Sequence, residues 1–203
     1  MNIVSVFDMV VAHGGRKSEL TPEVMGAVGG FCGDRFRHLM NNFGAVCECY
    51  LEIGSLHGAS LTSTCYGNDI EAYAIENFSE FDGNRETLTG NATKFAPQAK
   101  LIFGDCWLPE TIAQIPNGKV DLYFYDGCHS VESQEKALTV YASKMADQFI
   151  YIVDDWNWPQ VQEGARRGIA ASGLKILRSH EQPCPDGDAS GWWNGVGIFV
   201  LQK

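Results

Sequence analysis

The stretch Tyr50-Leu-Glu-Ile-Gly-Ser-Leu-His-Gly-Ala-Ser60 decides the fold of this chain. A short apolar run contains the acidic Glu52 near its end, and two glycines four positions apart, Gly54 and Gly58, lead into a helix-compatible segment. Glycine lets the backbone turn tightly and lets a ligand approach where a Cβ would block it. This order predicts the first strand, turn and helix of a nucleotide-binding α/β sheet. The spacing differs from the dinucleotide pattern G-x-G-x-x-G. This difference favours a nucleoside ligand other than a dinucleotide.

The chain after residue 46 alternates strand-like and helix-like segments at short intervals, a pattern typical of a parallel sheet with crossover helices. After Gly173 the alternation stops, and two strand-like segments follow with only a loop between them, which favours antiparallel pairing. We therefore predict an α/β fold with a mostly parallel seven-stranded sheet and an antiparallel C-terminal strand. The expected strands are Cys49–Ile53, Glu71–Ile75, Lys100–Phe103, Val120–Tyr125, Phe149–Val153, Leu174–Arg178 and Val196–Gln202. The expected helices between them are Ala59–Tyr66, Gly83–Phe95, Pro109–Ile115, Val131–Met145 and Pro159–Ala171.

Residues 1–45 are predicted to form an N-terminal helical cap, and residues 46–203 the main domain, within a single globular unit. Asn2 to Val11 is a short apolar segment, and Thr21-Pro22-Glu23 is typical of a helix start because it combines a hydroxyl cap, an early proline and an acid. The cap either covers one edge of the sheet or acts as a lid over a substrate.

The composition limits the classes of partner. Of the 203 residues, 45% are hydrophobic and 20% charged, which is ordinary for a soluble globular protein. The formal net charge of -10 argues against nucleic acid, because phosphate backbones are bound by Lys and Arg clusters. The longest apolar runs are far too short to cross a membrane, so we expect no membrane partner. Seven cysteines, an odd number without a regular framework, favour free thiols in a reducing cytoplasm.

Two later stretches also stand at the ends of predicted strands: Asp121-Leu-Tyr-Phe-Tyr-Asp-Gly-Cys-His-Ser130 and Ile150-Tyr-Ile-Val-Asp-Asp-Trp156. Together with the glycine turn, they resemble the class I S-adenosylmethionine (SAM)-dependent methyltransferases, a Rossmann-like fold. The Asp126-Gly-Cys-His129 segment resembles the signature of a family 24-like subgroup of small-molecule O-methyltransferases. The turn departs from the superfamily pattern at Leu56, where the usual residue is a middle glycine.

The resemblance implies that SAM is the cofactor and that the ends of the first four strands hold it. Glu76, at the end of the second strand, is placed to accept the ribose hydroxyls, and Asp105, after the third strand, is placed to contact adenine. Each could instead be structural: Glu76 as a solvated acid, Asp105 as a helix cap. The full set of residues expected at the cofactor is Glu52, Gly54, Ser55, Gly58, Glu76, Asp105, Cys106 and Asp126.

Asp126 and His129 are the predicted catalytic residues. Imidazole has an ordinary pKa that suits taking a proton from a hydroxyl near neutral pH. Asp126, Asp154 and Asp155 lie at the ends of strands expected to be neighbours, so their oxygens could share a divalent cation such as Mg²⁺, Mn²⁺ or Ca²⁺. Alternatively, Asp154 and Asp155 cap the helix that begins at Pro159, and His129 only hydrogen-bonds the loop.

The predicted function is SAM-dependent methyl transfer to a small molecule, at a hydroxyl oxygen. Two alternatives stay open: a catalytically silent member of the fold that binds a nucleoside or a partner protein, and a nicotinamide-dependent oxidoreductase. Four tryptophans are expected in loops above the site, Trp156, Trp158, Trp192 and Trp193, where aromatic walls suit a flat or sugar-like acceptor. The N-terminal helices could also mediate a homodimer.

Overall fold

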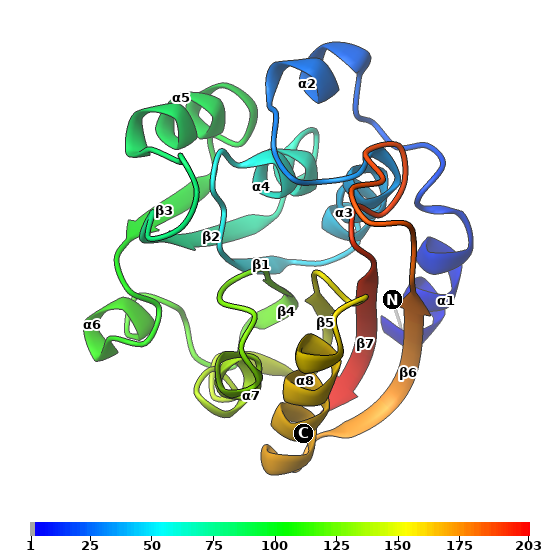
Figure 1. Ribbon diagram of the computed structural model, residues 1–203, viewed down its shortest axis with the longest axis vertical. Helices are drawn as coiled ribbons and strands as arrows, with labels where there is room; N and C mark the ends of the chain where they lie inside the picture. The colour runs from blue at the N-terminus through cyan, green and yellow to red at the C-terminus, as the bar shows by residue number, and fades with distance from the viewer. Residues whose placement is uncertain (1–2) are drawn as a thin grey trace.

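The computed structural model describes residues 3–203 and contains one seven-stranded sheet with the strand order β3-β2-β1-β4-β5-β7-β6 (Figure 1). The strands are β1 (Cys49–Ile53), β2 (Glu71–Glu76), β3 (Ala99–Phe103), β4 (Val120–Tyr125), β5 (Met145–Val153), β6 (Lys175–Gln182) and β7 (Val196–Gln202). Strands β1 to β5 pair with one another in parallel, whereas β7 runs antiparallel to both β5 and β6. The predicted fold class is confirmed.

Helices cover both faces of the sheet (Figure 1). One face packs against α1 (Ile3–His13), α3 (Asp34–Gly44), α4 (Ala59–Cys65) and α5 (Arg85–Phe95). The other face packs against α6 (Pro109–Ile112), α7 (Val131–Thr139) and α8 (Pro159–Ala171). The short α2 (Pro22–Ala27) packs with Ala59 and Phe95 in a smaller apolar cluster. The strands of a parallel sheet are buried on both faces, and all five residues of β1 are buried here.

The N-terminal residues contribute directly to the core of the sheet. Phe36 of α3 packs against Phe124 of β4 with ring centroids 5.1 Å apart, and Phe7 of α1 packs against Phe43 of α3 at 6.5 Å. The predicted start at Thr21 is present, because the Thr21 hydroxyl accepts the N–H of Val24. The division at residue 45 stays a prediction, and Asn2 lies outside the described residues.

Several predicted boundaries differ from the structure. The helix expected over Val131–Met145 ends at Thr139, and β5 begins at Met145, four residues before the predicted start. Residues 145–148 contain exposed polar side chains and lack a strand-like apolar pattern, but Val120 of β4 pairs with Met145 and Gln202 of β7 pairs with Gln148. Partners distant in sequence therefore extend this strand. Strand β6 also runs further than expected, to Gln182.

No helix in the described part of the chain is both long and apolar enough to cross a bilayer.

Candidate active site

The carboxyl ends of β1 to β5 open into a cavity of about 570 Å³. Ligands in open α/β sheets bind at this edge, beside the point where the strand order reverses, which here lies between β1 and β4. The volume lies within the range of about 300–1,000 Å³ that is usual for small-molecule sites.

The glycine turn after β1 is fixed by close packing on the end of β4. Gly54 has φ +88°, and a Cβ built there would lie 2.0 Å from the carbonyl oxygen of Asp126. Only glycine tolerates both the backbone conformation and this contact. Leu56, the residue that replaces the middle glycine, also has a positive φ of 46°.

Glu76 holds the turn in place from the end of β2. Its Oε2 accepts the N–H of Leu56 at 2.6 Å, and its Oε1 accepts the N–H of Phe78 at 2.6 Å. Because each carboxylate oxygen has a second lone pair, Glu76 can still accept hydroxyl groups from the cavity that it lines.

The other predicted cofactor residues separate into two groups. Gly54, Ser55, Asp105, Cys106 and Asp126 line the cavity. Asp105 also accepts the N–H of Trp107 at 2.9 Å, so it shapes the loop as well as facing the cavity. Glu52 and Gly58 are outside the lining.

Glu52 is completely buried beneath the glycine turn. The hydroxyl of Tyr50 donates to its Oε2, and within the described residues its Oε1 has no hydrogen-bond partner. Burial raises the pKa of Glu52 to about 7, although nearby hydroxyls, that of Tyr50 first, partly offset the effect. Gly58 faces α5 instead, where an added Cβ would lie 2.9 Å from Leu88 Cδ1.

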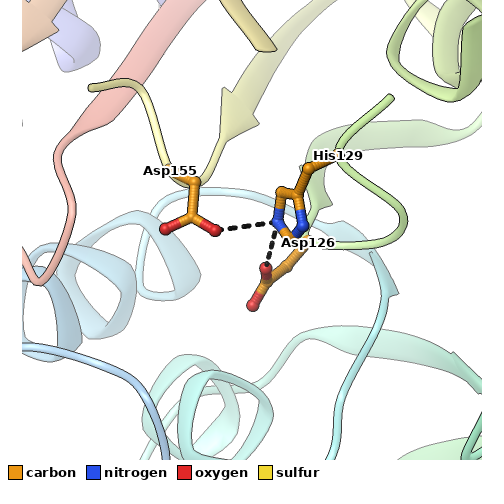
Figure 2. Close-up of side chains that lie close together, drawn as sticks. All are labelled: Asp126, His129 and Asp155. Carbon is orange, nitrogen blue, oxygen red and sulfur yellow. Dashed lines mark ion pairs between the residues drawn. The ribbon is translucent and has the colours of Figure 1, made fainter. Parts of the chain in front are cut away.

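After the ends of β4 and β5, Asp126, His129 and Asp155 meet in the same cavity (Figure 2). His129 Nε2 lies 2.8 Å from Asp155 Oδ2 and 3.7 Å from Asp126 Oδ1. We call this group the acid end. Its three ligand atoms lie within 4.8 Å of one another, and oxygen and imidazole nitrogen are donors that a divalent cation accepts. Asp154 lines the cavity but is not part of this group.

Burial and mutual repulsion shift the pKa values at the acid end. Burial raises the pKa of Asp126 to about 6, with His129 opposing the shift and Asp155 adding to it. Asp154 has a pKa well above its ordinary value because it is buried and close to the other two carboxylates. For His129, burial lowers the pKa, but the carboxylates of Asp126 and Asp155 outweigh burial and raise it to about 10.

Asp155 and Asn194 connect the acid end to the loop before β7. The side-chain N–H of Asn194 donates to Asp155 Oδ1 at 2.7 Å. Asp155 itself has φ +54°, an uncommon conformation for a residue other than glycine. Asn194 was not predicted, because nothing in a Pro- and Gly-rich loop indicates that it reaches a residue 39 positions away.

The four expected tryptophans have different positions. Trp158 and Trp193 line the cavity, and Trp158 stands edge-on to His129 with centroids 4.9 Å apart. Trp156 is buried against Phe199, and Trp192 packs on the core of the N-terminal helices. Phe31 and Phe81 also line the cavity; neither was predicted, since each lies in a loop without apolar periodicity.

The strand order, the reversal point and the acid-lined cavity together define a Rossmann-like class I methyltransferase fold. A family model described as a methyltransferase domain matches residues 51–156, slightly more than half of the chain. The chain belongs to this methyltransferase family. No curated protein sequence matches it.

Solved structures with the same fold include two O-methyltransferases. The Bacillus cereus O-methyltransferase in complex with SAH is 15% identical, with 99% of this chain and 90% of that chain covered and a TM-score of 0.58. TomG from Streptomyces achromogenes, an O-methyltransferase involved in tomaymycin synthesis and solved with SAM, is 13% identical, with both chains fully covered and a TM-score of 0.64. At these identities the likeness establishes the fold alone.

Proposed function

We propose that this protein transfers a methyl group from SAM to a small-molecule acceptor, at a hydroxyl oxygen. The observation that carries the proposal is that Asp126, His129 and Asp155 meet in the same cavity that the Gly54 turn opens into. A cofactor end and a proton-handling end in one cavity are what a methyl transfer to oxygen requires.

SAM, when bound, supplies a methyl group on a sulfonium, which an acceptor oxygen displaces in line. Gly54 and Ser55 would hold the cofactor at the turn, Glu76 would accept ribose hydroxyls, and Asp105 and Cys106 would contact the base. The lining contains six acidic residues and, over residues 3–203, no Lys or Arg. Such a cavity attracts the positively charged ammonium and sulfonium of SAM.

Proton transfer depends on the charge around His129. With a pKa of about 10, the imidazole already holds a proton at pH 7 and cannot accept another. Asp126 and Asp155, with Asp154 beside them, would hold a divalent cation such as Mg²⁺, Mn²⁺ or Ca²⁺, which would offset their charge and lower the pKa of an acceptor hydroxyl. His129 would then lose the stabilisation of its own proton and could serve as the general base.

Four finer proposals concern the compartment, the partner, the N-terminal segment and the assembly of the protein. Within the described residues, all seven cysteines are free thiols, which supports a reducing cytoplasm. The acid-lined cavity and the net charge of -10 support a small-molecule acceptor and argue against nucleic acid. We also retain as proposals a helical cap over residues 1–45 and a homodimer formed through it.

A side-by-side calorimetric titration tests the function. SAM and SAH should each release or absorb heat at 1:1 stoichiometry with micromolar protein, and NADH should give none. Transfer of a labelled methyl group from SAM to a panel of hydroxyl, amine and thiol compounds should then favour the hydroxyls. Binding of NADH but not SAM would instead support an oxidoreductase, and SAM binding without any acceptor would support a silent member.

A further inference from the structure

Three aromatic side chains from separate loops meet over the cavity. Phe31 lies 5.1 Å from Phe81 and 5.7 Å from Trp193, measured between ring centroids, and all three line the cavity. We call them the aromatic roof. Phe31 is 49% exposed and Phe81 is 65% exposed. Large apolar side chains that cluster on a surface usually mark a binding site.

The roof is attached to the acid end. Trp193 directly precedes Asn194, whose side-chain N–H donates to Asp155 Oδ1. The loop that carries Trp193 is in turn joined to the segment after Phe31, beside which it lies in Figure 1. The joining bonds run from the N–H of Asp34 to the carbonyl of Ala189, 2.8 Å, and from the N–H of Phe36 to that of Gly191, 3.2 Å.

A buried arginine holds the segment that leads to Phe31. Arg37 is 4% exposed, and its Nη1 donates to the carbonyls of Met25, 2.8 Å, and Val28, 3.2 Å. Its Nε donates to the hydroxyl of Ser63 on α4 at 2.8 Å. Phe31 therefore follows an anchored segment, and its part of the aromatic roof is preformed.

Two of the three roof residues hold an unfavourable backbone conformation. Phe81 has φ +60° and Trp193 has φ +62°. Bulky residues rarely occupy this region, at a cost of roughly 1–3 kcal/mol each, and such residues concentrate at ligand sites. Both rings line the cavity in this conformation.

The cavity also limits the charge and size of what the roof covers. Six acidic residues and, among the described residues, no Lys or Arg line it, so its side chains favour a neutral acceptor over one with a carboxylate or phosphate. SAM alone is a drug-sized ligand for a cavity of this volume. An acceptor that shares this cavity with SAM must therefore be small.

We propose that Phe31, Phe81 and Trp193 select the acceptor: a planar aromatic ring without anionic substituents, which stacks under the roof and directs its hydroxyl to Asp126, His129 and Asp155. The inference rests on the proposed methyl transfer to oxygen and names the acceptor class. Flat rings gain dispersion and offset-stacking contacts with aromatic side chains that a puckered ring of equal polarity does not gain.

The test compares a planar neutral diol with a saturated diol and with a planar diol that has a carboxylate. The full-length protein is first saturated with SAH, so that no turnover occurs, and then titrated in the presence of Mg²⁺ with 4-methylcatechol, 4-methylcyclohexane-1,2-diol or 3,4-dihydroxybenzoate. We expect the planar neutral diol to bind at least tenfold more tightly than either the saturated diol or the carboxylate.

Phe31→Leu and Phe81→Ala should each reduce that preference roughly fivefold to tenfold, while the Kd for SAH changes less than about threefold. Both side chains are about half exposed or more, so the variants should fold; Met9→Ala on α1, which is 52% exposed, is the matched control and should leave the preference unchanged.

The outcomes separate the two proposals. Equal affinity for the planar and saturated diols, a preference that survives both roof substitutions, or no binding of any diol to the SAH-loaded protein would overturn the acceptor class and leave the methyltransferase proposal standing. Failure of SAH to bind in the first step would overturn both.

Discussion

At the glycine-turn end of the cavity, the two oxygens of Glu76 each accept a backbone N–H, whereas at the acid end Asp126 and Asp155 share a single imidazole from His129. At the first end, both oxygens of Glu76 have backbone partners without a ligand, although Glu52 Oε1 and Ser55 Oγ at the same turn have none within the described residues. The second has more negative charge than His129 can balance, and burial, with repulsion between the carboxylates adding to it, raises the pKa values of Asp126 and Asp154. Shape is therefore preformed at the first end, and charge is left for a ligand to balance at the second.

The largest effect should follow from removing the imidazole at the acid end. His129→Gln should lower kcat on any hydroxyl acceptor found by about 10²- to 10⁴-fold, the usual contribution of a general base. The Kd for SAM should change little, because the turn end is intact. Steady-state kinetics with calorimetry measure both, and His13→Gln, an exposed position on α1, is the control. Unchanged kcat would remove His129 from the chemistry.

Disrupting the turn end should cost stability instead. In Gly54→Ala, the new Cβ would lie 2.0 Å from a carbonyl oxygen in a left-handed conformation. The expected loss is about 2–5 kcal/mol in the free energy of unfolding, together with loss of SAM binding. Gly118→Ala isolates the backbone cost, because Gly118 has φ +68° and nothing within 4 Å of the added Cβ. Urea denaturation of the two variants compares them, and equal losses would show that the contact with β4 is unimportant.

The turn and the ends of β4 and β5 were predictable because their signals are local. Gly54 lies beside its strand, and His129 follows Asp126 by three residues, so the sequence alone brings each set to the correct edge of the sheet. The sequence could not distinguish Asp154 from Asp155 as the partner of His129, because a positive φ at Asp155 redirects the chain there. Phe31, Phe81 and Asn194 could not be predicted, since long-range contacts between loops place them.

Glu52, beneath the turn, should make stability depend on pH. Its pKa is about 7 in the folded protein and about 4.5 when exposed, so its contribution to stability is fully present below pH 4.5 and is lost as pH rises through 7. Relative to wild type, Glu52→Gln should therefore gain roughly 3 kcal/mol between pH 4.5 and pH 8. Urea midpoints across this range measure the gain. A difference that does not vary with pH would mean that Glu52 is not charged by pH 8 or is not buried.

The smallest expected effect is a change in the titration of His129. With the protein free of divalent cations, the imidazole should titrate near pH 10, so its ion pairs stabilise the fold below about pH 6.5 and are lost as pH rises through 10. Asp155→Asn removes the nearer carboxylate and should lower the pKa of His129 by about one unit or more. NMR of the imidazole resonances follows the titration in the wild type and in Asp155→Asn. An unchanged pKa of His129 would show that Asp155 does not stabilise the protonated imidazole.

The most direct test of the division between the two ends is a calorimetric titration of SAM into Glu76→Ala and Asp155→Asn. If the turn end binds the cofactor and the acid end handles the acceptor, Glu76→Ala should weaken SAM binding by about tenfold or more, and Asp155→Asn by less than about threefold. Equal losses in the two variants, or a larger loss in Asp155→Asn, would contradict the account.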